Sequence, residues 1–202
     1  MKNPLVLSLA FLAVTALPVA AQNGKPDAEG FIRDWLILAP LPIADGGGAD
    51  AIDKKQFDTE AMPAAKEGAT QSIGSKQLTW EKTTTKEFYI DFKELHPSQS
   101  EQVVGWAVAY IVVAAEKTGL TLKMNSNDQG KAFLNGKEVV KFTDTRTLEK
   151  DAENSAEGLT LKKGVNVVVL KVANEENNWQ GSLRFVDKAG KPVTDLKIET
   201  KP

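Results

Sequence analysis

Hydrophobic and polar residues alternate over short stretches of this chain, and no stretch sustains the spacing of an amphipathic helix. Leu120, Leu122 and Met124 fall on one face of an alternating run, which is typical of a strand with one buried side. Val165–Ala173 is rich in β-branched residues with few polar breaks, as in strands that are covered on both faces. Turn residues separate these runs, so the pattern predicts an all-β sandwich with roughly nine strands and little helix.

The first half of the chain has a less regular pattern. Trp35–Pro42 is an apolar run that ends in two prolines with one leucine between them, which predicts an edge strand. Residues 44–51 (ADGGGADA) predict a flexible loop, and Phe57–Gly68 is where we expect one short helix. Glu87–Phe92 carries strand-forming residues and is predicted to be a further strand.

Asn135-Gly136 lies between two apolar runs and predicts a tight hairpin turn. A type I′ turn needs positive φ at both central residues, which Asn and Gly tolerate best. Asn127–Gly130 predicts a second turn just upstream, with side chains that accept local backbone hydrogen bonds. A two-residue hairpin loop pairs Leu134 with Lys137 and Phe133 with Glu138.

The first 21 residues are predicted to be a signal peptide. They begin with a positive charge at Lys2, continue with an apolar run too short to span a bilayer, and end in small residues before Gln22. We therefore expect export to the periplasm or the medium, and about 180 of the 202 residues remain after cleavage. The predicted organisation is a flexible N-terminus at residues 22–30 and a single sandwich domain at residues 31–202.

Charge and cysteine content exclude several classes of protein. Without Lys2 the chain has 24 basic and 27 acidic residues, and both signs are scattered, so no basic face is expected to bind nucleic acid. The chain has no cysteine, so neither a lipid anchor nor a disulfide is available and the hydrophobic core must supply the stability. No further segment approaches a membrane span.

Candidate catalytic and metal-binding residues are few. His96 is the only histidine, so zinc sites built from several His or Cys ligands are excluded, and we expect it to lie in a solvated loop. An EF-hand starting at Asn125 fails because Gly136 occupies the twelfth position. No Gly-x-Ser-x-Gly elbow and no phosphate-binding loop is present. Carboxylates are plentiful and a paired-acid glycosidase stays open, but no pair stands out, so the prediction is a non-enzyme.

Four segments resemble motifs of two related groups, the PA14-like β-sandwiches and the galactose-binding-like jelly-roll modules attached to bacterial glycoside hydrolases. Ser126–Lys137 (SNDQGKAFLNGK) resembles their S-D-D-G-x-x-x-W/Y-x-N/D-G-K hairpin. Leu159–Val172 resembles their L-x-x-G-x-N strand, Asn177–Phe185 their closing strand, and Trp35–Pro42 their opening segment. The resemblance implies a jelly-roll sandwich, usually a non-catalytic accessory module that binds glycans or packs against a partner domain.

The same resemblance bears on calcium. In calcium-dependent PA14-like adhesins two adjacent aspartates hold the metal that contacts the sugar. In this chain Asn127 replaces the first aspartate and only Asp128 remains. The prediction is therefore no cofactor, with calcium as the one alternative.

The four tryptophans are candidate sugar-binding side chains, because sugar rings stack on exposed aromatic planes. Trp35 and Trp106 alternate with apolar neighbours and are predicted to be core, and the orientation of Trp80 is open. Trp179 follows a polar loop whose amides could contact sugar hydroxyls, although the resemblance suggests that it caps the core. The predicted ligand-binding residues are Trp179, Asn177 and Asn178, with Asp128 and Asn135 at a neighbouring tip.

Two functions follow from these observations. The first is an exported, non-catalytic carbohydrate-binding module that recognises a glycan at the loop tips of the sandwich. The second is a structural or protein-interaction module that docks onto another exported protein and has no glycan ligand. The step from fold to function is an analogy in both cases, because such folds have unrelated roles.

Overall fold

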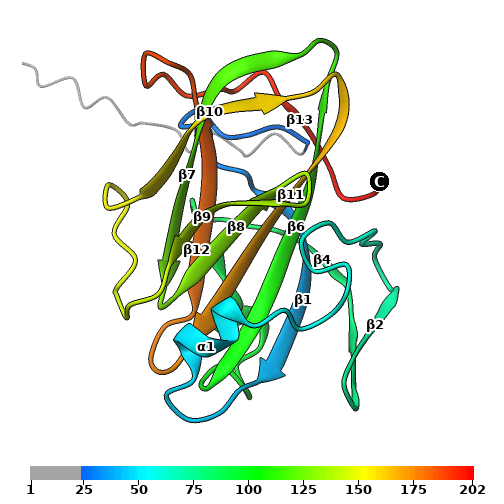
Figure 1. The fold of residues 1–202 in the computed structure, drawn as a ribbon, viewed down its shortest axis with the longest axis vertical. Coiled ribbons are helices and arrows are strands. Elements are labelled where there is room, and N and C mark those ends of the chain that lie inside the picture. Colours follow the sequence, from blue (N-terminus) through cyan, green and yellow to red (C-terminus); the bar gives the residue numbers. More distant parts are fainter. Residues whose placement is uncertain (1–23) are drawn as a thin grey trace, which may run out of the picture.

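Two antiparallel sheets face each other in the computed structural model, which describes residues 24–202 (Figure 1). The larger sheet has the order β4 (Glu81–Thr84), β1 (Asp34–Pro42), β6 (Val103–Val113), β11 (Gly164–Asn174), β8 (Gly130–Leu134) and β9 (Lys137–Phe142), and β13 (Lys197–Glu199) also pairs with β6. The smaller sheet has the order β10 (Asn154–Leu161), β7 (Lys117–Asn127), β12 (Gln180–Val186) and β5 (Ile90–Asp91). The predicted all-β sandwich is confirmed, with thirteen strands in this part of the chain.

The predicted signal peptide, residues 1–21, lies outside the described range. The segment that follows it contacts the sandwich from its first described residue. Gly24 donates to Asp34 Oδ2 at 2.7 Å and accepts from the backbone of Ile198, while Asp27 forms an ion pair with Arg33 at 3.0 Å. These contacts place residues 24–30 against the surface of the domain.

The larger sheet is buried on both faces, which explains its continuous apolar strands. On β6, Ala107, Ala109 and Ile111 face the smaller sheet, whereas Trp106 and Val108 belong to a separate core on the outer face. β11 alternates in the same way. A strand covered on both sides loses the polar positions that a half-exposed strand would show.

Residues 44–80 cover the outer face of the larger sheet. They comprise α1 (Gly48–Asp53), an irregular stretch, and the hairpin of β2 (Thr70–Ile73) and β3 (Lys76–Thr79). Phe57 packs edge-on against Trp106 at 5.3 Å, and the Tyr110 hydroxyl lies 3.0 Å from the backbone oxygens of Pro63 and Ala65.

A buried ion pair attaches this cover, the segment of residues 44–80, to the larger sheet. Lys171 Nζ, on β11, lies 2.9 Å from Glu60 Oε1 and 2.7 Å from the backbone oxygen of Lys54. Burial lowers the pKa of the Lys171 ammonium, and the adjacent Glu60 carboxylate opposes that shift. Removing either partner would leave an uncompensated charge in the core, so the pair holds the cover in one position.

Three local predictions were wrong. The expected helix at residues 57–68 is replaced by α1, which forms within the predicted flexible loop because Ala51 and Ile52 pack into the outer core. β1 is not an edge strand, since β4 pairs with its first half ahead of Pro40 and Pro42. Of residues 87–92, Ile90 and Asp91 form β5, and Phe92 then starts α2 (Phe92–Leu95), whose first turn the Asp91 side chain caps by accepting from Glu94 N at 2.9 Å.

The predicted Asn135-Gly136 hairpin is confirmed in its register. Leu134 pairs with Lys137 and Phe133 with Glu138, and φ is 51° at Asn135 and 82° at Gly136. Of the tryptophans, Trp35 and Trp106 are core as predicted, and Trp80 is buried as well. Within residues 24–202, neither helix is long or apolar enough to cross a membrane.

Candidate functional site

Three loops meet at one end of the sandwich, the lower end in Figure 1. They are the β7–β8 connection at residues 128–129, the β9–β10 loop at residues 143–153, and the β11–β12 loop at residues 175–179. Together they enclose a pocket of about 360 Å³. We call it the end pocket; its lining residues are Asn127, Asp128, Thr145, Arg146, Thr147, Glu175, Glu176 and Asn177.

Polar residues that are almost completely buried form the floor of this end of the sandwich. Every residue from Asn125 to Gln129 is at most 8% exposed. Asn125 Nδ2 donates to the backbone oxygen of Glu149, Ser126 Oγ donates to Asp128 O at 2.8 Å, and Glu175 N donates to Asp128 Oδ2 at 3.1 Å. Buried polar groups need such partners, so the stretch is polar because it ties the three loops together.

Arg146 fixes the β9–β10 loop against the end of β7. Its Nε donates to Ser126 O and its Nη2 to Ser126 Oγ, both at 2.9 Å, while Nη1 donates to Asn154 Oδ1 at 2.7 Å. The guanidinium also lies 3.9 Å from the centre of the Phe142 ring. Burial lowers the pKa of Arg146, but an arginine stays charged. Its donors are thus largely used within the protein, and its role is to position the wall of the pocket.

Asn127 bridges the two other loops. With its amide nitrogen turned toward the acceptors, Nδ2 donates to Asn178 O at 3.0 Å and to Arg146 O at 3.1 Å. An aspartate could not make these bonds, because its carboxylate would face two carbonyl oxygens. In addition, no three Asp, Glu or His side chains converge to hold a metal ion anywhere in residues 24–202. The residues present do not fit a calcium ion held by two adjacent carboxylates.

The end pocket has an acidic wall. Asp128 is 8% exposed, and no donor in the described part of the chain reaches its Oδ1. Glu175 Oε1 accepts from Gln129 Nε2 at 3.0 Å and from Gly48 N at 3.2 Å, which joins the β11–β12 loop to α1. Glu176 is exposed at the rim. The pocket therefore offers carboxylate, amide and hydroxyl oxygens on a wall that hydrogen bonds hold in place.

Three of the predicted binding residues lie together at this end. Asp128 and Asn177 line the end pocket, and Asn178 is next to it and exposed. Asn135 lies at the opposite end of β8, so its predicted place at a neighbouring tip was wrong. Its Nδ2 donates to Asn166 Oδ1 at 2.9 Å and its Oδ1 accepts from Val167 N at 2.9 Å, so it fastens the hairpin to β11.

Trp179 cannot present its ring to a sugar, which corrects its predicted stacking role. The side chain is 0% exposed, stacks on Phe92, and donates from Nε1 to Val172 O at 3.2 Å. Its ring also packs close to β6, where a Cβ on Gly105 would come within 2.8 Å of Trp179 Cζ2. Trp179 supports the β11–β12 loop from beneath.

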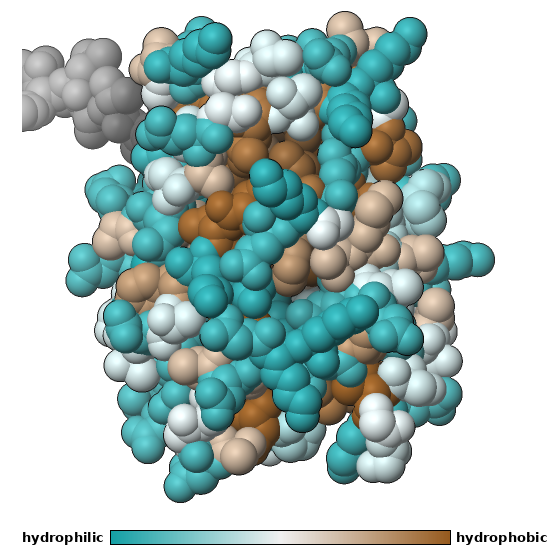
Figure 2. Space-filling model, viewed as in Figure 1, coloured by the Kyte–Doolittle hydropathy of each residue, from teal (hydrophilic) through white to brown (hydrophobic). Residues whose placement is uncertain are grey.

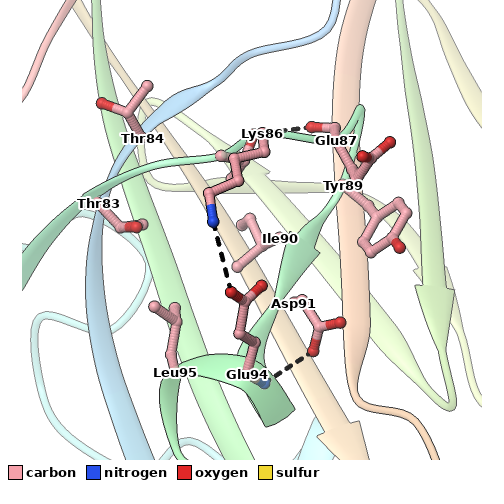
Figure 3. A pocket seen from close by; sticks show the side chains of 10 residues that line it. Thr83, Thr84, Lys86, Glu87, Tyr89, Ile90, Asp91, Glu94 and Leu95 are labelled. Atoms are coloured by element: carbon pink, nitrogen blue, oxygen red, sulfur yellow. Dashed lines mark hydrogen bonds and ion pairs between the residues drawn. The ribbon is translucent and has the colours of Figure 1, made fainter.

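A second pocket of about 380 Å³ lies at the side of the sandwich, between β4 and α2 (Figure 3). Lys86 and Glu94 face each other across it with 3.7 Å between Nζ and Oε1, over Ile90. Figure 3 shows Tyr89 and Asp91 directed to the other side of β5. The side pocket differs from the end pocket in its apolar lining residues, Ile90 and Leu95, and in the ion pair that spans it.

Sequence reasoning missed Arg146, Thr145 and Thr147 as pocket residues. They belong to a polar loop without a motif, and they reach the pocket only because Arg146 folds back onto Ser126. Glu175 and Glu176 could have been predicted, since they belong to the polar loop already singled out ahead of Trp179. The side pocket was not predicted either: its lining residues all lie within residues 83–95, but they form no recognisable motif.

No protein-family model matches the sequence, and no curated protein is significantly similar to it. Among solved structures, the PA14 sugar-binding domain from an RTX adhesin is similar with a TM-score of 0.34 and 9% identity, covering 46% of this chain and 51% of that one. A GH31 α-xylosidase from Xanthomonas citri is similar with a TM-score of 0.37 and 14% identity, over 86% of this chain and 18% of the xylosidase. The chain thus spans about half of the first structure and less than a fifth of the second.

Proposed function

We propose that this protein is a non-catalytic carbohydrate-binding module that takes a glycan in the end pocket. One observation carries the proposal: the pocket is lined with side-chain oxygens and nitrogens on loops that Asn127, Asp128 and Arg146 hold rigidly. A site fixed before the ligand arrives loses less conformational entropy on binding.

Sugars match the chemistry of this wall. A sugar hydroxyl both donates and accepts, so it can use the Thr145 and Thr147 hydroxyls, the Asn177 amide and the free oxygen of Asp128. Asn178 would extend the contact surface beyond the rim. Asp128 and Glu175 both accept bonds that fix loops, and we propose for that reason that the pocket binds and does not catalyse.

A glycan array followed by affinity electrophoresis on the polysaccharides that it identifies tests the proposal. Asn177 has φ of 68°, so Asn177→Gly removes the side chain without forcing a new residue into that backbone region. Asn177→Gly and Thr147→Ala should each weaken binding about fivefold or more with little change in melting temperature. Glu116→Ala, at the β6–β7 turn at the far end of the sandwich, should bind as wild type does. Binding to no glycan would overturn the proposal.

A protein-interaction module is the second candidate, and one observation favours it. Val139 on β9 and Leu159 on β10 are only partly buried at the free edges of the two sheets, and Figure 2 shows apolar side chains at the surface of this face of the molecule. An exposed apolar area can mark a protein contact. This candidate would replace the first under two conditions. The wild type would have to bind no glycan, and Val139→Lys would have to abolish binding of a protein partner captured from an exported fraction.

Export completes the proposal. It rests on the charged, apolar and small-residue segments of residues 1–21. N-terminal sequencing of the protein recovered outside the cytoplasm should begin at Gln22. Recovery of an uncleaved chain from the cytoplasm alone would contradict it.

A further inference from the structure

We propose that the end pocket selects glycans whose contacting units are uncharged or carry an amine, and rejects units that carry carboxylate or sulfate groups. This inference rests on the glycan-binding role proposed above and names the class of ligand for the same site. It follows from how the charges at the pocket are distributed and from which of them are already paired.

Carboxylates outnumber cations on the pocket wall. Asp128, Glu175 and Glu176 line it, against a single guanidinium from Arg146. Asp128 is more than nine-tenths buried; its Oδ2 accepts from Glu175 N, and no donor among the described residues reaches its Oδ1. A ligand acid placed here would meet like charges in a partly desolvated site.

The two nearby cations already donate hydrogen bonds to protein acceptors. Arg146 donates hydrogen bonds from Nε, Nη2 and Nη1 to Ser126 O, Ser126 Oγ and Asn154 Oδ1. Lys93, which reaches the rim from α2, donates to the backbone oxygen of Asn177 at 2.8 Å. A bidentate clamp of the kind that recognises carboxylate or sulfate therefore has no free arginine on this wall.

Two of the groups that remain available, the carboxylates of Asp128 and Glu176, can only accept hydrogen bonds. The Asn177 amide and the two threonine hydroxyls can both donate and accept. Sugar hydroxyls and protonated sugar amines donate hydrogen bonds and so complement this wall, whereas the oxygens of uronic acids and sulfated sugars only accept. The two carboxylates therefore favour ligand groups that donate hydrogen bonds over acid groups that only accept them.

The test compares a neutral polysaccharide, the best binder on a glycan array, with the same polysaccharide after oxidation of its primary alcohols to carboxylates. Wild type should bind the oxidised form about tenfold more weakly or worse. Glu176→Lys replaces a negative charge at the rim by a positive one, so it should reduce the ratio of neutral to oxidised affinity about threefold or more. Glu176 is exposed, so the variant should still fold. Glu116→Lys, the same charge change at the far end of the sandwich, should leave the ratio unchanged.

The outcomes separate this inference from the function beneath it. Equal binding of the neutral and oxidised forms, or a ratio that Glu176→Lys does not move, overturns the selectivity and leaves glycan binding in place. A ratio that Glu116→Lys moves equally would assign the effect to net charge and also overturn the inference. Failure to bind any neutral or amino glycan overturns the proposed function itself.

Discussion

The indole of Trp179 and the phenyl ring of Phe92 stack with their centroids 4.8 Å apart and their planes 20° from parallel. Phe92 opens α2, and the next residue, Lys93, donates to the backbone oxygen of Asn177 at 2.8 Å. The stacked pair and this hydrogen bond therefore join α2 to the β11–β12 loop. The tryptophan that the sequence placed beside a polar loop supports that loop from within the core.

Replacing Trp179 should lower stability. Trp179→Phe removes the indole N–H from Val172 O and leaves a void against Gly105, so we expect a loss of about 1–3 kcal/mol in the free energy of unfolding. Urea unfolding measures it, with Asn178→Ala as an exposed neighbouring control. An unchanged unfolding free energy, together with ready quenching of Trp179 by acrylamide, would contradict the buried position.

Replacing Arg146 by lysine should loosen the pocket wall. A lysine cannot reproduce the planar set of donors that meets Ser126 and Asn154, so Arg146→Lys should cost about 2 kcal/mol of stability and weaken glycan binding. Urea unfolding and affinity electrophoresis report the two effects. Lys163→Arg, at an exposed turn, is the control for a basic exchange. Wild-type stability and affinity in Arg146→Lys would show that the loop needs no such clamp.

Much of the fold was predictable because local rules agree with the tertiary structure. The Asn135-Gly136 turn set a register that the sheet keeps, and the β-branched run at Val165–Ala173 identified a strand covered on both faces. The cover formed by residues 44–80 was not predictable in the same way. α1 forms because Ala51 and Ile52 pack against an apolar sheet face. The glycine-rich sequence of this segment gives no sign of that contact.

The candidate site was predictable only in part. Asp128 and Asn177 were found because turn residues and amides stand out in the sequence. The burial of Trp179 was suggested only by the resemblance, because polar neighbours along the chain say nothing of the packing beneath a loop. Arg146 lies 20 residues from its partner Ser126, and no spacing rule links them.

Chelation of divalent metals should leave the protein unaffected. Asn127 donates to two carbonyl oxygens where a calcium-binding aspartate would be required, so excess chelator should change neither the melting temperature nor glycan affinity. Asn127→Asp should cost about 1–3 kcal/mol of stability, because its carboxylate would face those oxygens. Asn178→Asp is the matched control. A calcium-dependent rise in the melting temperature of the wild type would count against this account.

Stability should fall as the pH drops through the range of histidine. Burial lowers the pKa of His96 below its ordinary value of 6.5, against a weaker opposing effect of Glu81, and the ring nitrogen Nε2 is buried without a partner among the described residues. The unfolded chain therefore binds a proton at His96 more readily than the folded chain does. The contribution of neutral His96 to the free energy of unfolding is complete above pH 6.5 and is lost as the pH falls below it.

The single histidine makes that comparison simple. Unfolding free energies at about pH 7.5 and about pH 5.5 should differ for the wild type and stay nearly equal for His96→Leu, since carboxylates titrate lower. Equal pH dependence in both proteins would show that His96 is not the group responsible.

An amide NMR titration tests most directly whether the end pocket binds a glycan. The isotope-labelled protein is titrated with the neutral oligosaccharide that binds best on the array. We expect the largest shifts at Asp128, Thr147, Glu176 and Asn177, and no shifts at Asn135 and Glu116. Saturable shifts there would locate the glycan in the end pocket. No shifts with any bound sugar, or shifts centred on the side pocket at Lys86 and Glu94, would contradict it.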